Sequence, residues 1–319
     1  MTFKKAGGLV ALGAAVLLGV TACSAGAAAS GSSASSSAAT SASLLSPSSS
    51  DSVTAGVKVD PAAVKLLPAS VKKQGELTVA MDLAYPPTSF LASDNATAIG
   101  FNPDIARLLG KKLGLKIQIE NVSFDTIIPG IAGGRYSFTA TDMSPTPARL
   151  QVLDMINYWN AGSSLLVSTG NPLKLSFTNN SLCGKSIAVT TGSTEQLTYL
   201  PSLSTACTAA GKAAINAVIL PNVQAAITQL SSKRVSGVFY DTSSLGWAAT
   251  QQPKSFELLA PQFKNPTGSD LVAIGLAKDS PLTPAMHVAM QSVIDSPQYK
   301  EALSRWGLGA GAITSAKLD

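Results

Sequence analysis

The 319-residue sequence has little histidine, cysteine or charge: it contains one histidine, three cysteines and 13% charged residues. A single histidine, His287, and cysteines far apart in the chain would make a poor zinc site, so we expect no metal. The formal net charge is +5, but basic residues form no run and do not interleave with aromatic ones, which argues against a nucleic-acid partner. No phosphate-binding loop or nucleophile–base pair is evident, so we expect no cofactor.

The start of the chain has the pattern of an export signal. Lys4 and Lys5 precede an apolar stretch, residues 6–20, that is too short for a comfortable membrane span. The stretch ends in VTAC, residues 20–23, which resembles the lipobox of bacterial lipoproteins, where the cysteine is lipidated and becomes the first mature residue. The resemblance implies a signal peptide over residues 1–22 and a lipid on Cys23. An ordinary signal peptide cleaved nearby, or an uncleaved anchor, is the alternative.

Small residues dominate the next segment, and its composition is almost entirely serine, alanine, threonine and glycine from Ser24 to about Ser52. Such a segment lacks the large apolar side chains that offset the entropy of ordering, so we expect residues 23–59 to be a flexible tether. About thirty residues of this kind reach on the order of 30 Å, which suits a domain held near a membrane.

The odd number of cysteines is awkward for an exported protein. If Cys23 carries a lipid, Cys183 and Cys207 are left to pair with each other outside the reducing cytosol. We therefore predict a disulfide between these two residues.

Short β-like and helical patterns alternate in the rest of the chain. Strands are expected at 76–81, 115–122, 136–141, 185–191, 213–220, 235–241 and 271–278. Helices are expected at 102–114, 124–134, 194–211, 222–232, 281–294 and 297–306. The first of these helices should be capped by Asn102 and followed by Gly114. The alternation predicts an α/β fold with mostly parallel sheets, and about 250 residues suffice for two lobes.

Polar residues follow several of the predicted strands, at the edge where α/β sheets bind ligands. Arg149 and a helix start at Gly192 could hold a carboxylate, because free N–H groups and the helix dipole favour an anion. Aspartates at the same edges could hold an ammonium group. Together these groups suit a zwitterion. The residues at these edges are Asp82, Tyr85, Asp142, Ser144, Thr146, Arg149, Gly192, Ser193, Thr194 and Asp241.

Seven ordered motifs give the chain a resemblance to the polar amino-acid group (family 3 type) of ABC-importer solute-binding proteins, over about residues 74–312. The motifs are GELTVAMDLAYPP, IGFNPDIARLLGKKLG, SFDTIIPGIAGGRY, MSPTPARLQVLD, LCGKSIAVTTGST, GVFYDTSS and SPQYKEALSRWGLGAGAI. The resemblance implies a periplasmic-binding-protein-like fold with lobe 1 at 60–167 and 274–319 and lobe 2 at 168–273. The two crossings between lobes would lie near 165–168 and 271–273.

The resemblance also implies roles for individual residues. Arg149 corresponds to the arginine that clamps the ligand α-carboxylate, with hydroxyl and backbone contacts from Ser144. Asp241 corresponds to the aspartate that pairs with the α-ammonium group. Backbone donors would come from the second-lobe helix start at Gly192 to Thr194. The ligand side chain would lie between Tyr85 and Phe124, with Asp82 at its polar end.

Three positions depart from the family pattern. Ser137 stands where aspartate is common, Ser89 where an acidic residue is frequent, and Asp142 where a small residue is usual. Asp142 would add a carboxylate near the pocket, so the side-chain specificity of any one family member cannot be carried over. Outside these motifs, packing or surface roles are expected for His287, Trp159, Trp247 and Trp306.

The resemblance predicts a non-enzymatic, monomeric receptor, lipid-anchored on the outer face of a bacterial cytoplasmic membrane. It would capture an amino acid with a polar or cationic side chain and present it to the permease of an ABC importer. One alternative is an enzyme on the same fold, such as a dehydratase like cyclohexadienyl dehydratase, in which cleft aspartates act as acid or base. The other is a ligand-binding component of a sensor, which would use the same site.

Overall fold

The computed structural model describes residues 49–266 and 270–319. The expected signal peptide, Cys23 and most of the expected tether lie outside these residues. No helix within the described part of the chain is long and apolar enough to cross a membrane.

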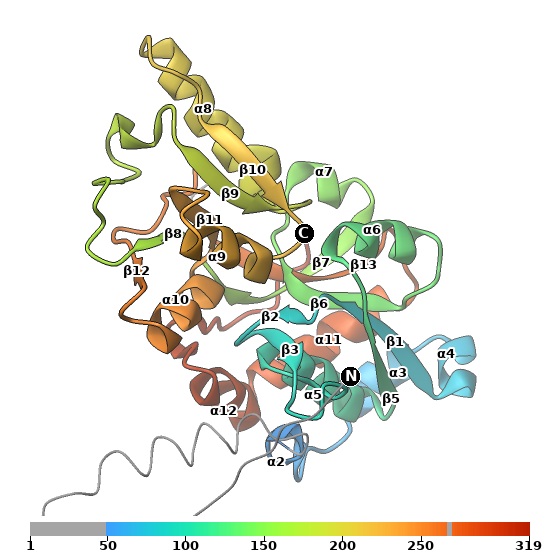
Figure 1. The fold of residues 1–319 in the computed structure, drawn as a ribbon. Helices are drawn as coiled ribbons and strands as arrows, with labels where there is room; N and C mark the ends of the chain where they lie inside the picture. The colour runs from blue at the N-terminus through green and yellow to red at the C-terminus, as the bar shows by residue number, and fades with distance from the viewer. Residues whose placement is uncertain (1–48, 267–269) are drawn as a thin grey trace, which may run out of the picture. The chain divides into compact units, whose positions relative to one another are not determined.

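One five-stranded sheet has the order β5-β1-β6-β13-β7 (Figure 1). β1 is parallel to both β5 and β6, whereas β13 is antiparallel to its neighbours β6 and β7. Four strands therefore run in one direction and β13 runs in the other. The bounds are Glu76–Met81 for β1, Lys116–Asn121 for β5, Phe138–Met143 for β6, Leu153–Asn160 for β7 and Leu271–Ala277 for β13.

A second five-stranded sheet has the order β10-β9-β11-β8-β12. β9 is parallel to β10 and β11, and β8 is antiparallel to β11 and β12. The expectation of mostly parallel sheets thus holds for strand direction, with one reversed strand in each sheet. The bounds are Ser163–Ser168 for β8, Ser186–Thr190 for β9, Asn216–Leu220 for β10, Gly237–Asp241 for β11 and Phe256–Leu258 for β12.

The chain passes between the sheets at positions that differ slightly from the expected ones. It leaves the first sheet at Asn160 and enters the second at Ser163, so the expected crossing at 165–168 lies inside β8. It leaves the second sheet after Leu258 and returns at Leu271, so 271–273 is the first part of β13. β7 and β8 form an almost continuous buried run, and the sequence therefore gives no turn signal strong enough to separate them.

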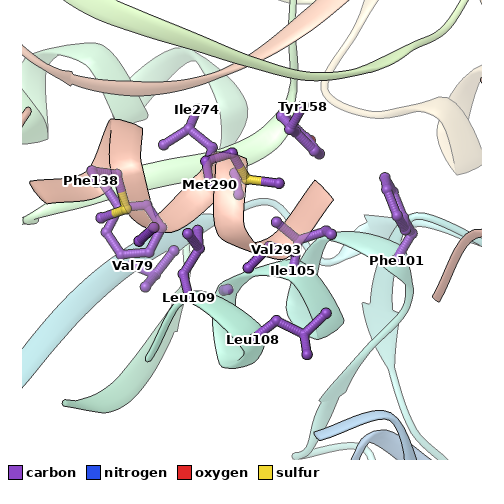
Figure 2. Close-up of a cluster of buried hydrophobic side chains, with 14 of the residues drawn as sticks. Val79, Phe101, Ile105, Leu108, Leu109, Phe138, Tyr158, Ile274, Met290 and Val293 are labelled. Atoms are coloured by element: carbon purple, nitrogen blue, oxygen red, sulfur yellow. The ribbon is translucent and has the colours of Figure 1, made fainter. Parts of the chain in front are cut away.

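Helices cover the first sheet: α5 and α11 pack against each other, and α3 also packs on α11. Side chains from both helices and from the sheet meet in one core, which includes Ile105, Leu109, Phe138, Ile274 and Met290 (Figure 2). The bounds are Ser49–Thr54 for α2, Pro61–Leu66 for α3, Ala69–Gln74 for α4, Phe101–Leu113 for α5, Phe124–Ala132 for α6, Pro147–Leu150 for α7, Thr283–Ile294 for α11 and Pro297–Arg305 for α12.

Three α-helices and two shorter helical turns belong to the second sheet. α9 packs on β9 and β11, and α10 packs on β8 and β12. A π-helical turn continues directly into α8, so the helix expected over 194–211 has two parts. The bounds are Asn180–Leu182 for η1, Glu195–Tyr199 for the π-turn η2, Leu200–Ala209 for α8, Val223–Ser231 for α9 and Thr242–Gln251 for α10, and the 3-10 turn η3 near the C-terminus spans Gly309–Gly311.

The beginning of α5 differs from the expectation. The helix starts at Phe101, and Gly100, not Asn102, occupies the N-cap position. Gly100 has a φ of 121°, and an added Cβ there would lie 2.5 Å from the Thr88 carbonyl oxygen, so a side chain does not fit. Asn102 is fully buried, and its side-chain amide donates hydrogen bonds to Ser89 Oγ at 2.8 Å and Asp142 Oδ1 at 3.2 Å.

The folded part begins earlier than expected. Residues 49–54 form α2, which packs against α5 and α12, although 23–59 is expected to be a tether. Val53 is completely buried in the first core and Val57 packs against it. The apolar contacts of these two valines help to offset the entropy lost when this segment is ordered.

A small sheet and the disulfide complete the described structure. The sheet has the order β2-β3-β4, with bounds Ala84–Tyr85, Ser89–Leu91 and Ala98–Ile99. The disulfide predicted between Cys183 and Cys207 is confirmed, with a Cα–Cα distance of 5.5 Å. It connects α8 to the segment before β9, within the part of the chain that forms the second sheet.

Candidate functional site

The ends of strands from both sheets meet around one small cavity. Six of the nine ligand-contact residues predicted from the sequence line it: Phe124, Asp142, Ser144, Arg149, Thr194 and Asp241. Three further lining residues were not among those nine contacts: Ser193, Glu195 and Tyr240. The cavity encloses about 10 Å³ of space, which is room for about one water molecule, so the two walls are close together.

Arg149 projects from α7 into this cavity and reaches the second wall. The helix begins with Pro147, and the Thr146 hydroxyl accepts a hydrogen bond from the Arg149 backbone N–H at 3.4 Å. Nη1 of Arg149 donates to the Ser144 carbonyl at 2.9 Å and to Thr194 Oγ1 at 3.3 Å, while Nη2 donates to the Gly192 carbonyl at 3.0 Å. The guanidinium therefore joins residues from both walls.

The environment of Arg149 keeps its charge available despite burial. The residue is 7% exposed, and its guanidinium carbon lies 5.5 Å from the centre of the Phe124 ring. Burial lowers the pKa of Arg149, and the negative charges of Glu195 and Asp241 oppose that change. The guanidinium is a strong base, and these two carboxylates favour its charged form.

The second wall is formed by the turn between β9 and η2. Gly192 has a φ of 76°, a conformation that glycine adopts without strain, and its carbonyl points to Arg149. Its N–H donates to Gln196 Oε1 at 2.7 Å, and the Ser193 N–H donates to the Thr190 carbonyl at 3.2 Å. These two N–H groups, expected to be free for a ligand, therefore have partners within the protein, and Gly192 offers the site an acceptor.

Three carboxylates face the cavity: Asp142 from the first wall, and Glu195 and Asp241 from the second. Burial raises the pKa of Asp142 to about 6, although hydrogen bonds from Thr88 and Asn102 favour its ionised form. Burial also raises the pKa of Glu195, and the hydrogen bond from Ser163 opposes this change. The pKa of Asp241 is raised well above its usual range, first by burial and then by the charges of Glu195 and Asp142.

Asp142 is held in place by a buried network. Its backbone has a φ of 53°, which is uncommon for a residue other than glycine. Its side chain accepts from Asn102, and its N–H donates to the Tyr158 hydroxyl at 3.4 Å. That hydroxyl donates in turn to Asn102 Oδ1 at 2.6 Å. A strained conformation secured by its neighbours is typical of residues at functional sites.

Asp82 and Tyr85 do not line the cavity, and Gly192 adjoins it through the hydrogen bond to Arg149. Asp82 follows β1, and its Oδ2 accepts from the Phe124 N–H at 3.1 Å. Burial raises the pKa of Asp82 to about 6. The Tyr85 ring, 3% exposed, packs on the cavity residue Tyr240 with 5.3 Å between ring centres. Both residues thus lie behind side chains that face the cavity.

The residues assigned to packing lie elsewhere. His287 lies on α11, and its Nε2 is hydrogen-bonded to the Ala316 carbonyl. Trp159 and Trp306 are buried in the first core, and Trp306 Nε1 donates to Asp104 Oδ2 at 2.8 Å. Within the described residues, no group of three or more histidine, cysteine or acidic side chains could hold a metal ion.

Sequence comparison places this chain in a known family. The model of the bacterial extracellular solute-binding proteins, family 3, matches residues 77–309. The chain belongs to this family. An arginine-binding protein of Corynebacterium glutamicum is 24% identical over 255 residues, 80% of this chain and 81% of the relative.

Solved structures share the fold. An ancestral arginine-binding protein bound to arginine has a TM-score of 0.64 and 25% identity, and the match covers 73% of this chain and 98% of that one. An ancestral amino-acid-binding protein described as a precursor of cyclohexadienyl dehydratase has a TM-score of 0.63 and 22% identity, covering 74% and 97%. This chain is thus a two-lobed solute-binding receptor of the family, with one lobe built on each five-stranded sheet.

Proposed function

We propose that this receptor binds an amino acid with a cationic side chain and delivers it to an ABC importer. The observation that carries the proposal is the cavity in which one guanidinium and three carboxylates converge from both lobes. A ligand with one carboxylate and two cationic groups satisfies this set better than a neutral or acidic amino acid. The Corynebacterium relative is named as an arginine-binding protein, which agrees with this chemistry.

In the proposed complex, Arg149 holds the α-carboxylate with its planar fork, which can donate two parallel hydrogen bonds. Asp241 pairs with the α-ammonium group. Asp142 attracts the cationic end of the side chain, and Asp82, behind Phe124, adds negative potential there. To take this position the ligand must replace the hydrogen bonds that Arg149 makes to the Ser144 and Gly192 carbonyls.

Ligand capture is proposed to proceed by lobe closure. Arg149, Ser144 and Asp142 belong to the first lobe, whereas Thr194 and Asp241 belong to the second. A ligand that touches both sets binds the closed arrangement more tightly than the open one, and only this difference in affinity can drive closure. The crossing at 160–163 is a segment about which the lobes would move.

The membrane attachment is part of the same proposal. A lipid on Cys23 and a tether of small residues would hold the lobes near the outer face of the membrane, within reach of the permease. We propose that the protein acts there as a monomer and without catalysis. Mass analysis of the mature protein tests the attachment, since a lipidated protein begins at Cys23 and carries the extra mass of acyl chains.

A thermal-shift screen of the twenty amino acids plus ornithine and citrulline tests the ligand class, followed by calorimetry. A ligand at a hundredfold excess over its Kd adds about 2.7 kcal/mol of stability. We expect arginine, lysine or ornithine to give the largest shifts, and Arg149→Ala to abolish them. Tight binding of leucine or valine, with arginine, lysine and glutamine silent, would reject the proposal. Turnover of a cyclic amino-acid precursor would instead support an enzyme on this fold.

A further inference from the structure

Glu195 is a buried carboxylate in the cavity wall with no role in the site described so far. It is the first residue of η2 and is only 3% exposed. Its Oε1 accepts a hydrogen bond from Ser163 Oγ at 2.5 Å, and Ser163, the first residue of β8, is itself buried. Glu195 is therefore fixed between the turn that carries Thr194 and the strand that enters the second lobe.

Ser163 also connects Glu195 to the proposed ammonium partner. In the antiparallel pairing of β8 and β11, Ser163 is the register partner of Asp241. Ser163 thus contacts Glu195 through its side chain and pairs with Asp241 in the sheet. The charge of Glu195 raises the pKa of Asp241 more than the charge of Asp142 does, whereas Arg149 lowers it.

The charges that line the cavity do not balance. Asp142, Glu195 and Asp241 are acidic and Arg149 is the one basic lining residue, which leaves two negative charges in excess. Arg149 and Asp241 suffice for the two charges that every zwitterionic amino acid carries. A buried charge without a partner is costly, so the remaining carboxylates must hold protons or face further positive charge on the ligand.

We propose that Glu195, together with Asp142, sets the charge selectivity of this receptor, so that an amino acid with a positive side chain is preferred over a neutral one of the same shape. The inference rests on the proposed function. Asp241 meets the ammonium group that all amino acids share, so its removal weakens all of them alike. Glu195 is not needed to pair with the ammonium group, and its negative potential favours ligands with a more positive net charge.

The test compares L-arginine with L-citrulline, which has nearly the same shape but an uncharged ureido group. Glu195→Gln keeps the length of the side chain and an oxygen that can accept from Ser163, and removes the charge. A charge pair about 6 Å apart at an effective dielectric constant of about 20 is equivalent to roughly a hundredfold in affinity. Allowing for screening, we expect calorimetry to show a 10- to 100-fold loss of preference for arginine over citrulline, with citrulline affinity unchanged or improved.

Three variants serve as controls. Glu195→Asp keeps the charge and should retain the preference. Asp241→Asn should weaken both ligands strongly, because both carry the ammonium group that Asp241 is proposed to bind. Glu257→Gln makes the same substitution on β12, where the carboxylate accepts from the Gly170 N–H outside the cavity, and should change neither ligand.

The outcomes separate this inference from the proposed function. If the wild-type protein binds none of arginine, lysine and ornithine, the proposed function fails. If it binds arginine but Glu195→Gln lowers the affinities for arginine and citrulline equally, or leaves the preference for arginine intact, Glu195 has only a structural role and the inference is overturned.

Discussion

The guanidinium of Arg149 in the first lobe donates to the carbonyl of Gly192 in the second, with 3.0 Å between Nη2 and the oxygen. The contact joins a cation that follows β6 to a turn that follows β9. The residue that we propose as the anchor of the ligand therefore also makes a direct contact between the two lobes. A ligand carboxylate that takes over this guanidinium must supply contacts to the second lobe in exchange.

Arg149→Ala and Arg149→Lys should both bind the preferred ligand much more weakly than the wild type. Leaving the partner of a buried charge pair unpaired costs about 2–5 kcal/mol, or roughly 30- to 4000-fold in affinity. Lysine keeps the charge but lacks the planar fork, so most of the loss should remain. Calorimetry measures the change. Arg135→Ala, at an exposed arginine beside Tyr136, is the control and should bind normally. Normal binding by Arg149→Ala would contradict our placement of the site.

Gly192→Ala should weaken ligand binding and reduce stability. An alanine at a φ of 76° costs about 1–2 kcal/mol, and relief of this strain would displace the turn that carries Thr194, which lines the cavity. We expect an affinity loss of about 5- to 30-fold by calorimetry. Gly170→Ala is a matched control in the same lobe, with a φ of 77° and no atom within 4 Å of the added Cβ. It should lose stability without losing affinity, and equal affinity losses in the two variants would refute the local role of Gly192.

Binding of a cationic ligand should strengthen as the pH rises from 5 to 7. Asp82 and Asp142 each have a pKa of about 6, so at pH 5 both are largely protonated and must lose a proton to face a cation. Each group can contribute about tenfold over this range, and the two together about a hundredfold. Calorimetry of arginine binding at several pH values measures how steeply the affinity rises with pH, and Asp142→Asn should make this dependence shallower. An affinity that falls with rising pH would show that these carboxylates do not face the ligand cation.

Removal of the disulfide by Cys183→Ala together with Cys207→Ala should lower the free energy of unfolding by about 3 kcal/mol. The bond closes a loop with a sequence separation of 24, and the estimate follows from the chain entropy that such a loop removes from the unfolded state. Calorimetry should show a melting temperature lower by roughly 5–10 °C. Reducing agent should destabilise the wild type but not the variant. Two free thiols in the non-reduced, secreted protein would contradict the pairing.

The predictions from sequence succeed best where one local pattern dictates the structure. The α5 stripe of Ile105, Leu108, Leu109 and Leu113 has the helical spacing, and Gly114 adopts the left-handed conformation that ends the helix. The cysteine pairing followed from the count of three together with the resemblance of VTAC to a lipobox, which assigns Cys23 to a lipid. The order of motifs identified Arg149 and Asp241, which lie about ninety residues apart in the sequence and line the same cavity.

The predictions fail where tertiary contacts decide. Asparagine is a common helix-capping residue, but Asn102 is buried and its side chain instead forms hydrogen bonds with three polar partners. Glu195 lies in a helical segment as expected, but nothing in TGSTEQ shows that its carboxylate turns inward to meet Ser163. Tyr240 lies in a strand of small and apolar residues, and only the approach of Tyr85 shows which way it faces.

The position of β13 has a consequence for the order in which the lobes can form. The second sheet is built from one continuous stretch of chain, from Ser163 to Leu258, and can assemble as soon as that stretch is available. The first sheet cannot, because β13 lies between β6 and β7 and is the last strand of the chain. A protein truncated before Leu271 would keep every strand of the second sheet while the first stayed divided into β5-β1-β6 and an isolated β7. During export, the lobe that begins first is therefore the one completed last.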